Sequence, residues 1–266
     1  MYSNLKPEIS ENLKKSIMIE SNERTGLTSI YGLRMITDDH LIELISYLIK
    51  MSQSKAVKLD SFILHNAKLS DAGISILLEY LEVHWNSLKT LKLYNNIMNI
   101  VESNREIPYL LKSTSLFASF LYQATQLETL ELHGFFLHSE DLPSFCHALS
   151  KCYLLRKLHL SNNNLSDFGV SYLAKVLSLH NTIPLENITL YNNNIGDCGA
   201  QMIADALYGS DSLESLNLQM NFIKDLGASF FVDFVRKGAY PSVRKIVLAG
   251  NQCSERMKRF IKANTP

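Results

Sequence analysis

Apolar residues recur along this chain at a fixed period, and within each period they change from an alternating to a helical spacing. The phrase reads LRKLHLSNNNLSDFG over 155–169, LENITLYNNNIGDCG over 185–199 and LESLNLQMNFIKDLG over 213–227. Its skeleton is L-x-x-L-x-L-x-x-N-x-L-x-x-x-G. Related phrases begin at residues 59, 88, 127 and 243, so the seven starts lie 29, 39, 28, 30, 28 and 30 residues apart. Such a repeat indicates an array of similar structural units.

Each half of the unit predicts a different element. The alternating L-x-L segment predicts a short strand with its leucines on one face. After the glycine, apolar residues four apart predict one face of a helix, as for Leu173 with Leu177 and Ile203 with Leu207. One strand and one helix cannot bury these leucines alone. We therefore expect the units to stack into a parallel sheet lined by helices.

The ninth position of the unit predicts a further contact between units. An asparagine there can hydrogen-bond backbone groups where the chain leaves the strand, and stacked units would then form an asparagine ladder. Ala67 and Phe135 replace the asparagine in two units, and the ladder residues of the other five are Asn96, Asn163, Asn193, Asn221 and Asn251.

The repeat also predicts the organisation of the chain as one structural domain. Residues 1–58 form an N-terminal segment with a degenerate capping unit, in which 36–39 precede an apolar helical stripe, and 1–20 are either a helix or a tail. Seven repeats follow over 59–253, with an insertion near 99–112, and 254–266 form a C-terminal cap. Caps are expected because an open end of the array would expose leucines.

This pattern resembles the leucine-rich-repeat family, in particular its ribonuclease-inhibitor-like subclass with units of about 28 to 29 residues. The resemblance covers residues 59 to about 254. It implies an α/β leucine-rich-repeat solenoid shaped like a horseshoe, with a parallel sheet on the concave side and helices on the convex side. Mammalian ribonuclease inhibitors are rich in cysteine, whereas this chain has only four cysteines.

Composition restricts the classes of binding partner and the cellular compartment to be expected for this chain. The 42 leucines are accounted for mainly by the repeat, and 26 basic residues balance 26 acidic ones. A net charge of zero argues against a nucleic-acid or membrane-surface partner. The cysteines form no C-x-x-C pair, and residues 1–15 contain no apolar signal-peptide core. We therefore expect a cytoplasmic protein with reduced thiols.

Candidate binding residues lie at the strand positions that point away from the leucines, which would form the concave face. Tyrosine offers a rigid contact surface and a hydroxyl, so we interpret Tyr94 and Tyr191 as contacts, the alternative being that they shield their neighbours. The insertion is either part of the binding face or a tolerated surface loop. The predicted partner-binding residues are His65, Lys92, Tyr94, Glu131, His133, His159, Tyr191, Asn217, Gln219, and Arg105 and Tyr109 of the insertion.

Charged residues on this face alternate in sign from unit to unit. Lys92 and Glu131 would occupy neighbouring strands about 4.8 Å apart, so we expect them to pair with each other rather than to form a charge code for a partner. Glu131, His133 and His159 resemble a metal or acid–base site, but a metal site needs three or four ligands in fixed geometry, and no further carboxylate or cysteine completes this one. The sequence contains no G-x-S-x-G, P-loop or H-E-x-x-H motif. We therefore predict no catalytic residue, metal or cofactor.

The leading hypothesis is a non-enzymatic module that clasps one globular protein, as a monomer forming a heterodimer. Resemblance to ribonuclease inhibitor makes occlusion of a partner enzyme's active site its most concrete form. The alternatives are a GTPase regulator of the Ran GTPase-activating-protein type and a metal-dependent enzyme. The Asn-, Ile-, Lys- and Ser-rich composition also resembles leucine-rich-repeat effectors of intracellular bacterial pathogens. That resemblance implies translocation to the host cytosol, with a host protein or another effector as partner.

Overall fold

The computed structural model describes residues 9–22, 24–54, 58–84, 86–95, 113–135, 137, 140–236, 238 and 242–264. The insertion predicted near 99–112, with Arg105 and Tyr109, lies outside the described residues. Among the helices within these ranges, none combines the length and the apolar character needed to cross a bilayer. The elements are α1 (Glu11–Ser16), β1 (Ile17–Ser21), β2 (Leu27–Gly32), β3 (Ile36–Thr37), α2 (Asp38–Ser54), β4 (Lys58–Lys68), α3 (Asp71–Glu82), β5 (Thr90–Asn95), α4 (Ser113–Gln123), β6 (Thr129–His133), α5 (Leu142–Leu149), β7 (Lys157–His159), α6 (Ser166–Leu177), β8 (Asn187–Thr189), α7 (Asp197–Leu207), β9 (Ser215–Asn217), α8 (Asp225–Arg236), β10 (Lys245–Val247) and α9 (Glu255–Asn264).

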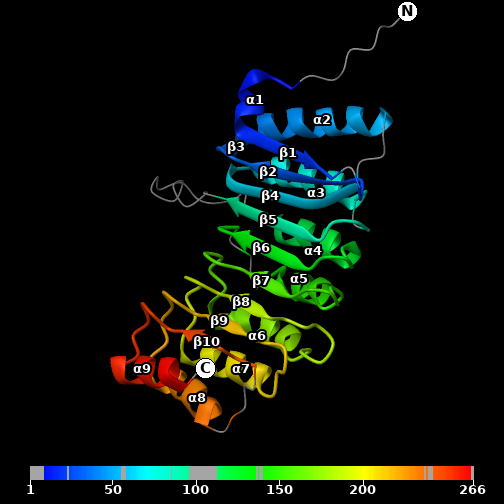
Figure 1. Cartoon of the computed structure of the whole chain (residues 1–266). Helices are drawn as coiled ribbons and strands as arrows, with labels where there is room; N and C mark the ends of the chain where they lie inside the picture. Colours follow the sequence, from blue (N-terminus) through cyan, green and yellow to red (C-terminus); the bar gives the residue numbers. More distant parts are fainter. Residues whose placement is uncertain are drawn as a thin grey trace, which may run out of the picture.

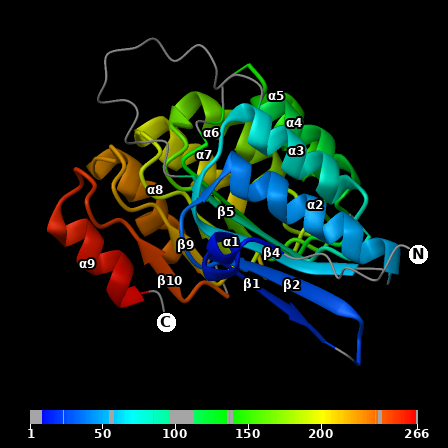
Figure 2. The same cartoon turned by 90° about the horizontal axis from the view of Figure 1, so that it is seen from above.

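The strands form one open sheet whose order follows the chain. The sheet runs β1-β2-β4-β5-β6-β7-β8-β9-β10, with β3 paired to β4. All described pairings are parallel except that of β1 with β2. Successive strands are stacked like rungs, and the helices line one side of the stack (Figures 1 and 2). The predicted α/β solenoid with a parallel sheet is therefore confirmed.

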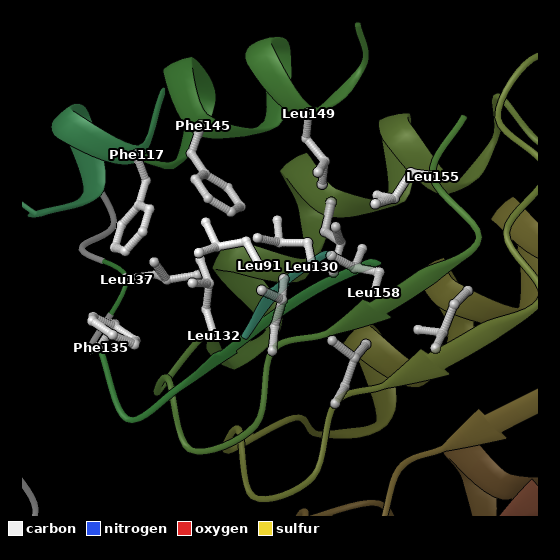
Figure 3. Packing of buried hydrophobic residues seen from close by; sticks show 14 of the residues in the cluster. Leu91, Phe117, Leu130, Leu132, Phe135, Leu137, Phe145, Leu149, Leu155 and Leu158 are labelled. Atoms are coloured by element: carbon white, nitrogen blue, oxygen red, sulfur yellow. The ribbon is translucent and has the colours of Figure 1, made fainter. Parts of the chain in front are cut away.

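The hydrophobic core fills the space between the sheet and the helices. The strand leucines pair in register, Leu91 with Leu130 and Leu130 with Leu158, and all three are fully buried. Phe117 of α4 and Phe145 of α5 reach down onto this row from the helix side (Figure 3). A single unit could not achieve close packing of this kind, because each strand leucine packs beside the leucines of the neighbouring units.

The N-terminal end is closed by a hairpin that the repeat pattern did not specify. The sequence predicts a helix or a tail for residues 1–20, and the structure places α1 and most of β1 there. β1 lies antiparallel to β2, with Ile17 opposite Gly32. Alternation explains the pairing, since Ile17 and Ile30 are buried while Met18 is exposed. Ser10 caps α1 by accepting a hydrogen bond from the Leu13 amide at 3.2 Å.

The predicted asparagine ladder is present among the described residues as Asn163, Asn193, Asn221 and Asn251, all buried, and the predicted member Asn96 lies outside these residues. Each side chain serves the backbone of the unit before it. Asn193 Oδ1 accepts a hydrogen bond from the Asn163 amide at 3.0 Å, and its Nδ2 donates to the Leu160 carbonyl at 2.6 Å. One unit closer to the N-terminus, Asn163 Oδ1 accepts a hydrogen bond from the Phe135 amide at 2.8 Å. The unit with Phe135 therefore lacks its own asparagine but is still held by the following one.

A second link runs in the opposite direction, from the aspartate at the start of one helix to the backbone of the next unit. Asp197 Oδ1 accepts hydrogen bonds from the Lys224 and Gly227 amides at 2.7 and 2.9 Å. This contact explains the glycine of the repeat, because a Cβ at Gly227 would lie 2.5 Å from the same oxygen. A Cβ at Gly199 would likewise lie 2.5 Å from Asp167 Oδ1. The repeat glycine therefore provides room for the aspartate of the preceding unit.

Candidate functional site

Three neighbouring strands bring five of the nine predicted binding residues that the structure describes into one cluster on the face away from the helices. The register of β5, β6 and β7 aligns Lys92 with Glu131 and Glu131 with His159. The next outward-facing position along the strands aligns Tyr94 with His133. Because side chains two residues apart lie on the same face of a strand, these five form a compact group, which we call the Tyr94–Glu131 cluster.

Glu131 is the buried anion at the centre of this cluster, with 4% of its surface exposed. Its Oε1 lies 2.8 Å from Lys92 Nζ and 3.4 Å from His159 Nδ1, and its Oε2 accepts a hydrogen bond from the Tyr94 hydroxyl. Burial alone would raise the pKa of Glu131. The hydrogen bonds from His159, Lys92 and Tyr94 outweigh burial and hold the pKa of this carboxyl well below its usual range. Glu131 is therefore a carboxylate at neutral pH.

Tyr94 is fixed by ring contacts as well as by its hydroxyl. The His133 ring stacks on it with centroids 4.1 Å apart and planes 14° apart, and the His65 ring approaches at 5.1 Å from the other neighbouring strand. Burial, followed by the hydrogen bond to Glu131, raises the pKa of Tyr94, so the phenol stays protonated. Burial lowers the pKa of His133 to about 4. The cluster thus presents a neutral imidazole and a half-buried phenol beside a paired carboxylate.

Charged residues pair across the strands, as the sequence predicted. Besides Lys92 with Glu131, Lys89 Nζ lies 3.3 Å from Glu128 Oε1, and Arg156 pairs with Glu186. The Lys89 and Arg156 pairs are largely exposed, so each adds little to stability. Their effect is on the surface charge: over these strands the two signs compensate each other.

The remaining predicted residues do not join the cluster. Tyr191 is half-buried and follows β8, three strands from Tyr94, which corresponds to about 14 Å at the usual strand spacing. Asn217 is turned back on its own segment, since its Oδ1 accepts from the Gln219 amide at 3.0 Å. His65 lies at the edge of the cluster and is exposed. The predicted contact residues therefore separate into a dense centre on β5 to β7 and a sparser area over β8 and β9.

Three members of the cluster could hold a metal ion. Glu131, His133 and His159 each offer a ligand atom, and these atoms lie within 4.8 Å of one another. The sequence offers no further carboxylate or cysteine for this group, but open zinc sites use three protein ligands and leave the fourth position to water. Sequence reasoning missed the contacts that fix the group, above all the Tyr94–His133 stack. The available signal was that both aromatic rings occupy the same position of adjacent units.

Comparisons with known proteins agree with this architecture. A family model described as "Leucine Rich repeat" matches residues 151–174 and 210–232. Ribonuclease inhibitor of Mus musculus is 34% identical over 103 residues, covering 39% of this chain and 22% of that protein. NACHT, LRR and PYD domains-containing protein 4B of Mus musculus is 31% identical over 138 residues, covering 49% of this chain and 15% of that protein. The chain thus matches less than a quarter of the length of either curated relative.

Among solved structures, the tropomodulin C-terminal domain of Caenorhabditis elegans superposes with a TM-score of 0.48 at 14% identity, covering 57% of this chain and 90% of that one. The repeat spacing, the sheet topology and the sequence matches together show that this chain has an α/β solenoid fold of the leucine-rich-repeat type, with repeats similar to those of ribonuclease inhibitor.

Proposed function

We propose that the chain is a protein-binding module whose concave face, over β4 to β10, takes up a protein partner with Tyr94 at the centre of the contact. The observation that carries the proposal is the fixed geometry of Tyr94. Its ring is stacked on His133 and its hydroxyl is held by Glu131 before any partner arrives. A side chain that is ordered in advance loses little conformational entropy on binding, and tyrosine is enriched at the energetic centres of interfaces.

The character of the face also favours a protein over a nucleic acid or a small substrate. Cross-strand pairs such as Lys92 with Glu131 and Arg156 with Glu186 balance the charge along the sheet. Phosphate recognition needs an excess of basic groups on one surface, whereas a protein interface accepts a mixed polar rim around aromatic anchors. An open sheet also offers a broad contact area, while small molecules are usually enclosed by a pocket.

In its finer form the proposal is a monomer that covers the active site of one partner enzyme and thereby inhibits it. Similarity to a protein named ribonuclease inhibitor supports this form, since that name states an action on an enzyme. A cytosolic site of action is supported by the four free cysteines, three of them buried. A bacterial effector origin, with translocation to a host cytosol, stays a prediction from composition.

Affinity capture with matched tyrosine variants tests this proposal. The immobilised chain would be exposed to eukaryotic and bacterial lysates, with bound proteins quantified by mass spectrometry. Tyr94→Ala should abolish capture of a specific protein, and Tyr191→Ala should weaken it. The control is Tyr153→Ala, a tyrosine that is 50% exposed and outside the strands of the sheet. With the captured partner purified, Tyr94→Ala should raise the dissociation constant by about 30-fold or more, the usual effect at an interface centre.

Equal capture of every protein by Tyr94→Ala and Tyr153→Ala would show that the concave face is not the binding surface. The inhibitory form needs a further assay, in which the chain is titrated into the partner's own activity measurement. Loss of activity that is complete at one equivalent supports occlusion of an active site. Unchanged activity with intact binding would refute inhibition and leave the binding function in place.

A further inference from the structure

Glu131, His133 and His159 come from two adjacent strands and converge on one point of the sheet face. Glu131 and His133 are separated by one residue on β6, so their side chains share a face, and His159 lies beside Glu131 on β7. Their ligand atoms lie within 4.8 Å of one another, and one pair, His159 Nδ1 with Glu131 Oε1, is already at 3.4 Å. Strand register thus places two imidazoles and a carboxylate together without any contribution from a loop.

The spacing of these atoms is close to that of a ligand set around a transition metal. Zinc binds imidazole nitrogen and carboxylate oxygen at about 2.0–2.2 Å, so ligand atoms in a tetrahedral site lie about 3.3 Å apart. The His159–Glu131 pair meets that value. Because all separations are within 4.8 Å, the group requires a closing movement of at most about 1.5 Å, which rotation of a half-buried imidazole can supply.

His133 supplies a nitrogen whose hydrogen-bonding capacity is unused. Its Nε2 is buried and has no hydrogen-bond partner among the described residues, which is costly for a polar atom. The ring is held by face-to-face stacking on Tyr94, and stacking leaves the in-plane lone pair accessible to a ligand. A metal ion coordinated through Nε2 would satisfy this nitrogen, which no described residue does.

We propose that Glu131, His133 and His159 form a binding site for one divalent transition-metal ion, for which Zn²⁺ is the appropriate probe. Two histidines and one carboxylate are a ligand set that selects such ions over Mg²⁺, which prefers oxygen ligands. Three protein ligands leave a fourth coordination position for water on the solvent side of the buried carboxylate. The site requires no partner protein, so it stands independently of the binding function proposed above.

Two neighbours of Glu131 would change the affinity for the ion in opposite directions. Lys92 Nζ, 2.8 Å from Oε1, occupies the place of a cation and must move aside when metal binds. Its side chain is 27% exposed, so it can turn into solvent. Tyr94 donates to the other oxygen, Oε2, and keeps the carboxylate oriented during binding. Such orienting hydrogen bonds to metal ligands are typically worth about 10- to 100-fold in affinity.

Replacement of Lys92 therefore tests the proposal through an expected gain in metal affinity, not a loss. In isothermal titration calorimetry of the metal-free protein with ZnCl₂, the wild-type chain should bind one ion per chain with a saturable isotherm. Lys92→Met should bind Zn²⁺ at least tenfold more tightly, because it removes the competing cation. His133→Gln and His159→Gln should weaken binding at least tenfold, and MgCl₂ should produce no binding heat at this site. The control is His147→Gln, an exposed histidine on α5.

Circular dichroism on each variant verifies that the fold is retained, and Lys92→Met keeps the test decisive even if a histidine variant unfolds. The proposal is overturned if the wild-type chain binds no stoichiometric Zn²⁺. It is equally overturned if His133→Gln and His159→Gln, when folded, bind as the wild type does, or if Lys92→Met weakens binding. None of these results bears on the capture experiment, which measures a protein partner without added metal.

Discussion

Replacement of Asn193 by alanine should test the asparagine ladder at the position where its contacts are most complete. The side chain is fully buried, and its amide accepts from the Asn163 amide at 3.0 Å and donates to the Leu160 carbonyl at 2.6 Å. Weaker contacts reach the Leu165 amide at 3.4 Å and the Tyr191 carbonyl at 3.3 Å. Alanine would leave at least one backbone donor and one backbone acceptor buried without a partner.

The size of the effect follows from those two orphaned groups. Each buried polar group that loses its partner costs about 1–3 kcal/mol, so Asn193→Ala should lower the free energy of unfolding by about 2–6 kcal/mol. Urea denaturation followed by circular dichroism measures this difference. Asn193→Asp keeps the acceptor but loses the donor to Leu160, and we expect it to destabilise the chain as well.

The matched control is Asn187→Ala, in the strand of the same unit. Asn187 is half-buried on the concave face, and its replacement should change the free energy of unfolding by less than about 0.5 kcal/mol. Equal effects of Asn193→Ala and Asn187→Ala would refute the reasoning. A fully stable Asn193→Asp variant would show that the hydrogen bond to Leu160 contributes nothing.

Phe135, Asp197 and the cysteines offer three further tests. Phe135→Ala should lower the free energy of unfolding by about 3–5 kcal/mol in urea, because it opens a cavity where a ring with 1% exposure stands. Asp197→Ala should lower it by about 1 kcal/mol, since it removes the acceptor at the start of the next helix. In a thiol titration of the native protein at pH 8, only Cys198 should react quickly, because it is exposed while burial raises the pKa values of Cys146 and Cys152 to about 12.

Each of these tests has its own comparison. Phe222→Ala removes a ring that is 53% exposed and should cost far less than Phe135→Ala. Asp211→Ala changes an exposed aspartate between helix α7 and strand β9, and similar losses for it and Asp197→Ala would contradict the capping role. Cys198→Ser should eliminate the fast thiol reaction, and a fast phase that persists would mean that a buried cysteine is accessible.

The elements could be predicted from the sequence because strand and helix are encoded within each unit. The L-x-L phrase placed β7, β8 and β9, and the apolar residues four apart placed α6 and α7. The Lys92–Glu131 pair could also be predicted, since equivalent positions of adjacent units become neighbours in a parallel sheet.

Contacts between unlike positions of two units could not be predicted in this way. Asp197 binds the amide of Gly227, thirty residues further on, and no pattern inside one unit shows that a backbone group there needs an acceptor. The N-terminal hairpin was missed for a related reason. β1 pairs antiparallel at the end of the sheet, so its five residues carry no copy of the repeat that could have identified it. The cluster contacts of Tyr94 likewise depend on side-chain rotamers, which spacing does not specify.

The two links between units run in opposite directions, and this has a consequence for how such a chain can grow. Each of the three units that begin at residues 155, 185 and 213 offers an asparagine to the unit before it and an aspartate to the segment after it, as Asn193 and Asp197 do. A tandem duplication of one such whole unit therefore supplies both the asparagine and the aspartate that link the added copy to its neighbours. A duplication that copied only the strand or only the helix would leave one of the two hydrogen-bonded links without its side chain. The gene can lengthen by whole repeats, which is how a solenoid can change the span of its binding face without redesigning its core.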